Sequence, residues 1–96
     1  MKNADEQSIK TILQELVETY RLKSRLYQNK VESLWERLMG KTVAGYTKEL
    51  KVRNQKLYVT VDSAPLRQEL SYTRGKILEH LNQELGEAYL KDVIIR

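Results

Sequence analysis

The stretch "ELKVRNQKLYVTV", residues 49–61, predicts a β-hairpin and therefore the sheet around which the domain is built. Apolar and polar residues alternate on both sides of Asn54-Gln55, which is the period of strands with one buried face. With a two-residue turn at Asn54-Gln55, the paired positions are Arg53–Lys56, Val52–Leu57 and Leu50–Val59. In this register all four aliphatic residues share one face of the sheet.

The segment after the hairpin, "SAPLRQELSYTRGKILEHLNQELG" (residues 63–86), predicts a helix. Asp62 or Ser63 can cap its start, because a side-chain oxygen accepts a hydrogen bond from the first turn. Pro65 is tolerated in the first turn, where its missing N–H costs nothing. Leucines follow at four- and seven-residue steps, and Gly86 then provides the usual stop.

Gly75 interrupts this predicted helix and costs roughly 1 kcal/mol relative to alanine. We expect it to allow close approach of another helix or of the sheet, with the backbone of a partner protein as the second explanation. The last segment, "YLKDVIIR" (residues 89–96), is rich in β-branched residues and predicts a closing strand.

Two helices are predicted before the hairpin. The first carries an apolar stripe at helical spacing: Ile9, Ile12, Leu13, Leu16, Val17 and Tyr20. The second carries another, which Gly40 ends as a C-terminal cap: Val31, Leu34, Trp35, Leu38 and Met39. The intervening "RLKSRLYQNK" (residues 21–30) fits either a continued helix or a short turn against the core. We expect both stripes, including Tyr20 and Trp35, to lie in the core.

These elements predict an α+β domain with the order α-α-β-β-α-β, in which helices pack on one face of a three-stranded sheet. The length of 96 residues fits one domain, over residues 8–96, after a flexible segment at residues 1–7. No apolar run is long enough to span a membrane, and there is no cysteine. We therefore expect a cytoplasmic protein.

The net charge of +4 is unevenly distributed. Residues 1–20 carry −2 and residues 57–96 carry −1, whereas residues 21–56 hold ten basic and three acidic side chains and carry +7. A segment this basic is typical of a polyanion-binding surface. A solvated, lysine-rich surface is an equally good explanation of the charge alone.

Two sets of residues are candidates for binding nucleic acid, since basic side chains neutralise phosphates and aromatic rings stack on bases. One is the basic run and the other is the polar face of the sheet: Arg21, Lys23, Arg25 and Lys30, and Lys51, Arg53, Lys56 and Tyr58. On the predicted helix at 63–86, Arg67, Ser71 and Arg74 fall on one side, away from the leucines. We expect that side to contact a protein partner.

The sequence lacks the patterns of catalysis. Its one histidine, His80, forms no metal-binding cluster, and we expect no metal or cofactor. Neither a nucleophile elbow nor a phosphate-binding loop is present. We therefore expect a protein that is not an enzyme and has no small-molecule substrate.

Four runs in the chain resemble the DciA family of bacterial proteins. They are "LWERLMGKTVAGYT", "LYVTVDSAPLRQEL", "ILEHLNQELG" and "VIIR". The shared pattern is the order Trp35, Gly40, Thr47, Leu57-x-Val59-x-Val61, Ser63, Glu69-Leu70, Leu81-Asn82 and Gly86.

The resemblance implies a domain similar to the KH fold and a role beside the replicative DNA helicase. It implies binding to that helicase, help in loading it, and contact with single-stranded DNA. The chain lacks the Gly-x-x-Gly loop with which KH domains clamp nucleic acid, and without cysteine it has no zinc ribbon. The alternative function is that of a protein–protein adaptor with no direct role in nucleic-acid binding.

Overall fold

The computed structural model describes the backbone of residues 2–96 and the side chains of residues 8–96. Its elements are α1 (Lys2–Tyr46), β1 (Thr47–Arg53), β2 (Lys56–Val61), α2 (Ala64–Tyr72), α3 (Arg74–Leu85) and β3 (Asp92–Ile95). The predicted α+β class with a three-stranded sheet is confirmed, in the order α-β-β-α-α-β. The backbone of residues 2–7 belongs to α1, and the prediction that residues 1–7 are flexible stays a prediction.

The two predicted N-terminal helices form one helix, α1, because residues 21–30 continue it. No glycine or proline occurs before Gly40, and most residues of 21–30 are good helix formers. At Gly40 the backbone has φ 88° and ψ 167°, so the helix kinks there and resumes for one more stretch to Tyr46. This conformation is not the predicted left-handed cap, and it is one that only glycine adopts without strain.

The hairpin forms in the predicted register. Arg53 pairs with Lys56, and Asn54 and Gln55 both have positive φ, at 53° and 62°. Positive φ at both central residues defines a type I′ turn, whose twist matches that of the strands. The strand order is β1-β2-β3, with β1 antiparallel and β3 parallel to β2.

The predicted helix at 63–86 is two helices, α2 and α3, which separate at Thr73. Its predicted ends are confirmed: the Ser63 hydroxyl accepts a hydrogen bond from the Leu66 N–H, and Gly86 is left-handed. The expected close approach at Gly75 is wrong within the described chain. A Cβ added at Gly75 meets nothing within 4 Å, and the residue is exposed.

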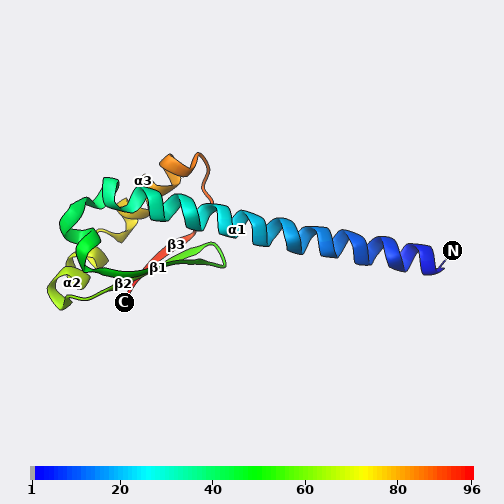
Figure 1. The fold of residues 1–96 in the computed structure, drawn as a ribbon, viewed down its shortest axis with the longest axis horizontal. Helices are drawn as coiled ribbons and strands as arrows, with labels where there is room; N and C mark the ends of the chain where they lie inside the picture. Colours follow the sequence, from blue (N-terminus) through cyan, green and yellow to red (C-terminus); the bar gives the residue numbers. More distant parts are fainter. Residues whose placement is uncertain (1) are drawn as a thin grey trace.

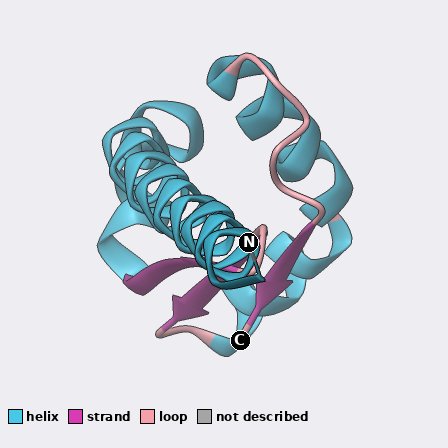
Figure 2. Ribbon diagram, turned by 90° about the vertical axis from the view of Figure 1, so that its right-hand side faces the viewer, coloured by secondary structure: helices cyan, strands magenta, loops and turns pink. Residues whose placement is uncertain are grey.

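The core lies between one face of the sheet and the helices that cover it, mainly α1 and α3, with Leu70 of α2 completing it (Figure 2). Its buried residues are Tyr27, Val31, Trp35, Val52, Leu57, Val59, Val61, Leu70, Ile77, Leu81, Leu85, Tyr89, Leu90 and Val93. Trp35 is the expected core anchor, and its indole N–H donates to the Thr47 hydroxyl at 3.0 Å. The second predicted stripe of α1 therefore packs on the sheet.

The first predicted stripe does not lie in the core. Its six residues are 44–60% exposed, because α1 is much longer than the sheet and continues past the hairpin turn (Figure 1). The molecule measures 62 × 24 × 19 Å, and its long axis runs along this projecting helix. We call residues 8–20 of α1 the arm.

Candidate nucleic-acid interface

A cleft of about 470 Å³ lies between α1 and β1, next to the hairpin turn. Its lining residues come from three segments: Tyr20, Arg21, Ser24, Arg25 and Gln28 of α1, Lys51, Val52 and Arg53 of β1, and Asn54 of the turn. Four of the nine are cationic and none is acidic. We call this surface the basic cleft.

Gln28 holds the two walls of the basic cleft together. Its side-chain N–H₂ donates to the Leu50 carbonyl at 2.7 Å, and its side-chain carbonyl accepts from the Val52 N–H at 2.6 Å. The amide thus pairs with β1 as a neighbouring strand would. At the mouth of the cleft, the Tyr20 hydroxyl donates to the Asn54 side chain at 3.3 Å.

The cations of the basic cleft are Arg21, Arg25, Lys51 and Arg53, and no described acidic side chain forms an ion pair with them. Like charges around one cleft raise the local potential and attract an anion when no acidic partner offsets them. The basic cleft therefore suits a polyanion such as a nucleic-acid backbone.

The groove between α1 and β1 changes charge along its length. Beyond Gln28, towards the Gly40 kink, a second cleft of about 460 Å³ is lined by Glu32, Glu36 and Glu49, with Lys48 as its single cation. The acidic half of the groove repels a polyanion, whereas the half beside the hairpin turn attracts one.

Lys23 and Lys30, which the sequence groups with Arg21 and Arg25, do not line the basic cleft. They lie beside Tyr27, with the Lys30 ammonium 5.3 Å from the centre of its ring. Successive side chains of a helix point about 100° apart, so a basic run along the sequence divides between two sides of α1.

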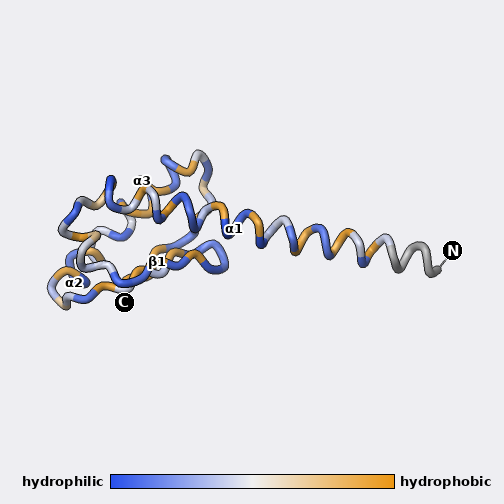
Figure 3. Tube along the Cα trace, viewed as in Figure 1, coloured by the Kyte–Doolittle hydropathy of each residue, from blue (hydrophilic) through white to orange (hydrophobic). Residues whose placement is uncertain are grey.

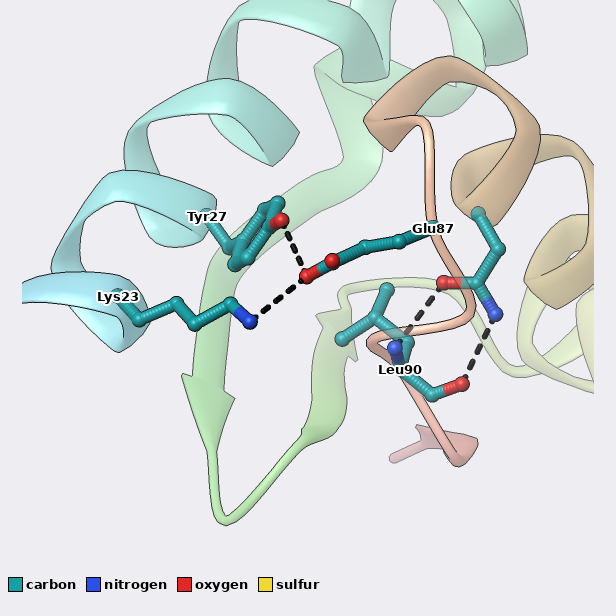
Figure 4. A network of polar contacts seen from close by, with 5 residues as sticks. Lys23, Tyr27, Glu87 and Leu90 are labelled. Carbon is teal, nitrogen blue, oxygen red and sulfur yellow. Dashed lines mark hydrogen bonds and ion pairs between the residues drawn. The ribbon is translucent and has the colours of Figure 1, made fainter. Parts of the chain in front are cut away.

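Lys23 belongs to a cluster of side chains that joins α1 to the loop before β3 (Figure 4). We call this cluster the clasp, and its members are Lys23, Tyr27, Glu87 and Tyr89. The Lys23 ammonium lies 3.1 Å from a carboxylate oxygen of Glu87, which also accepts a hydrogen bond from the Tyr27 hydroxyl. The Tyr27 ring stacks on Tyr89 at 4.1 Å between centroids. Lys23 is therefore already paired, which makes it a weaker candidate for phosphate contact.

The same loop is fixed to α3 by Asn82. Its side-chain N–H₂ donates to the Leu90 carbonyl at 2.9 Å, and its side-chain carbonyl accepts from the Leu90 N–H at 3.0 Å. The clasp and Asn82 together hold the loop between the two covering helices (Figure 4).

The clasp makes stability depend on pH in two windows. The hydrogen bond to Glu87 is the main reason why the pKa of Tyr27 rises to about 12, and the same bond lowers the pKa of Glu87. The stabilisation due to the raised pKa of Tyr27 is complete below its ordinary value of 10.0 and is lost as pH rises towards 12. The stabilisation due to Glu87 is complete above its ordinary value of 4.5 and is lost as pH falls below it.

We expect Tyr27→Phe to be less stable than the wild type around neutral pH, with a difference that shrinks above pH 10 and below pH 4.5. Urea denaturation at a series of pH values measures this difference. Tyr46→Phe is the control, since Tyr46 is exposed and its hydroxyl has no hydrogen bond to residues 8–96. A difference for Tyr27→Phe that stays constant across the whole pH range would contradict the role of the Glu87 hydrogen bond.

Lys56 and Tyr58 lie on β2 and do not line the basic cleft, although they pair across the hairpin with Arg53 and Lys51, which do. Lys56 is exposed beside the hairpin turn, and Tyr58 occupies the face of the sheet opposite the core. The Arg96 guanidinium lies 4.9 Å from the centre of the Tyr58 ring and also pairs with Glu49 at 3.8 Å. Part of the predicted stacking surface is thus covered by the chain itself.

The predicted partner-binding residues do not form one helical side, since α2 and α3 are separate. Arg67 is on α2 and donates to the Val61 carbonyl at 3.2 Å, which ties α2 to the end of β2. The Ser71 hydroxyl donates to the Arg67 carbonyl at 2.8 Å. Arg74 is exposed in the first turn of α3 and lies beyond the break.

The part of the chain that the structure describes holds no cluster of side chains able to bind a metal ion, and His80 is exposed on α3. In residues 2–96 no helix combines the length and the apolar character needed to cross a membrane.

Sequence reasoning missed Gln28 and Asn54 as parts of this site. The bonds of Gln28 to β1 join positions more than twenty residues apart, and neither residue belongs to a recognisable motif. The helical phase of α1 does predict that Arg21 and Arg25 share a side. It does not reveal that the side faces β1.

The fold and its cleft define a small α+β domain whose candidate site is a charged binding surface. A family model described as "Dna[CI] antecedent, DciA" matches residues 8–95, nearly the whole chain. The chain belongs to the DciA family, which is linked to loading of the replicative helicase and is not a known enzyme family. No curated protein and no solved structure matches it, so the KH-like topology stays a prediction.

Proposed function

We propose that this protein is a non-enzymatic accessory of bacterial DNA replication that binds the replicative helicase in the cytoplasm and assists its loading. Membership of the DciA family supports the helicase as partner. We further propose that the protein contacts single-stranded nucleic acid with Arg21, Arg25, Lys51 and Arg53. The convergence of these four unpaired cations in one cleft is the observation that supports this contact.

The nucleic-acid strand is proposed to lie along the hairpin half of the groove. Tyr20 lines the cleft and is half-exposed, so in a single chain its ring is available for stacking on a base. The two amides of the lining already have partners in the protein: Gln28 bonds to β1, and the side-chain carbonyl of Asn54 accepts from Tyr20. Because charge and a ring are what remains for the ligand, binding should depend little on sequence. Lys56 and Tyr58 would extend the contact around the hairpin, whereas Lys23 and Lys30 would add only long-range attraction.

Two binding assays test the proposal separately. In the first, the immobilised protein should retain purified replicative helicase at micromolar concentration, and no retention would contradict the partner. In the second, fluorescence anisotropy of a labelled single-stranded DNA oligomer should show binding that weakens linearly in log affinity against log salt. Helicase retention without any DNA binding at low salt would favour the adaptor function.

A further inference from the structure

The arm carries an apolar surface that no described part of the protein covers. Ile9, Leu13, Leu16 and Tyr20 follow one another at three- and four-residue steps, with Ile12 and Val17 beside them. Ile9 and Leu16 are each 60% exposed. Figure 3 shows the apolar residues recurring along α1 well beyond the sheet. A contiguous apolar face of this kind marks an interaction surface.

The exposed face continues the face of α1 that packs on the sheet. At about 100° per residue, Ile9 and Leu16 point in the same direction as Tyr27 and Leu34. The hydrogen bond between Tyr20 and Asn54 marks the point where the sheet ends. An element packed on the arm would therefore extend the core past the hairpin turn.

The spacing of the apolar residues is self-complementary. When a second copy of the arm runs antiparallel, the central pairs that face each other are Ile9 with Tyr20 and Leu13 with Leu16, and each pair occurs twice. At about 100° per residue, Ile12 and Val17 lie on opposite flanks of this central line, so a two-fold axis places each of them beside the same flank of the other copy. A two-fold interface has this reciprocal pattern.

The charges and the geometry of the arm are compatible with such a pair. Residues 8–20 carry only Lys10, Glu15 and Glu18, so two copies repel each other little. Antiparallel helices also align their macrodipoles favourably. Since packed helices cross at an angle, their ends diverge, and the first turn of each copy passes beside the hairpin turn of the other.

We propose that the arm is the dimerisation surface of this protein, and that its occupant is the arm of a second copy in antiparallel orientation. The stripe is about 17 Å long, at a rise of about 1.5 Å per residue. Two such faces bury on the order of 1,000 Å², near the lower limit of specific interfaces. The dimer is therefore weak, with a dissociation constant on the order of micromolar or above.

Sedimentation velocity of the full chain over a series of concentrations tests the proposal. We expect a shift from one to two chain masses as the concentration rises, and Leu16→Glu should remain a single chain throughout. Leu22→Glu is the matched control, because Leu22 is 63% exposed on the same helix but lies outside the stripe. A wild type that stays monomeric, or a Leu22→Glu variant that loses dimers equally, overturns the proposal.

Cross-linking tests the orientation, since the natural chain has no cysteine to interfere. Ile9→Cys chains mixed with Tyr20→Cys chains should form a disulfide-linked heterodimer under mild oxidation. Ile9→Cys alone should not cross-link, because two antiparallel copies place these positions at opposite ends of the contact. Efficient cross-linking of Ile9→Cys with itself would indicate parallel pairing and overturn the antiparallel model.

Discussion

Leu81→Ala is expected to lower the free energy of unfolding by about 2–5 kcal/mol, a large share of the stability of a domain this size. Leu81 is fully buried between α3 and the sheet, so the smaller side chain leaves a cavity that close-packed neighbours fill only in part. Urea denaturation followed by circular dichroism measures the loss, which should appear as a lower midpoint with little change in slope.

Leu16→Ala is the matched leucine substitution in the arm, and its expected cost in dilute solution is within about 0.5 kcal/mol of zero. Leu16 is 60% exposed on α1 and belongs to no described buried cluster, so a single chain has little packing to lose there. The difference between the two losses in free energy of unfolding shows how much more the core contributes to stability than the arm does. Equal losses for Leu81→Ala and Leu16→Ala would mean that the arm packs on the domain.

The second large effect is expected from replacing Arg21, Arg25, Lys51 and Arg53 together with glutamine. Each phosphate contact contributes about 0.7 to the slope of log affinity against log salt for a single strand. Removing four contacts should therefore flatten the slope by about 3 and weaken binding at low salt on the order of 10- to 100-fold. Anisotropy of a labelled single-stranded oligomer at several salt concentrations gives both quantities.

The matched control removes four exposed cations that lie outside the basic cleft: Lys41, Arg74, Lys76 and Lys91. It lowers the net charge by the same amount, so any effect of overall charge appears equally in both variants. We expect it to keep most of the slope. An equal loss in the two variants would show that binding follows the total charge and does not use the basic cleft.

The hairpin and its neighbouring helix ends were predictable from sequence, because their signals are local. The alternation around Asn54-Gln55 determines the register, and Ser63 and Gly86 act on their own turns of helix. The break at Thr73 was not predictable in this way, since the leucine spacing continues across it.

The arm shows the limit of periodicity as a guide to burial. Its stripe predicts an amphipathic helix correctly, but spacing does not say whether the covering partner is part of the same chain. Of the predicted nucleic-acid residues, four line one cleft, because helix phase and strand pairing bring them there. Helical phase places Lys23 on another side of α1, where it pairs with Glu87, a residue distant in sequence.

The two hydrogen bonds of Gln28 also affect how the protein behaves in concentrated solution. β1 is one of the two outer strands of the sheet, and the unpaired backbone groups of an outer strand can recruit a strand from another molecule. The amide of Gln28 occupies such groups at Leu50 and Val52. The protection of β1 against pairing with another molecule thus depends on α1 keeping Gln28 in place. Local opening of α1 at Gln28 would expose the backbone groups of Leu50 and Val52 to a strand of another molecule.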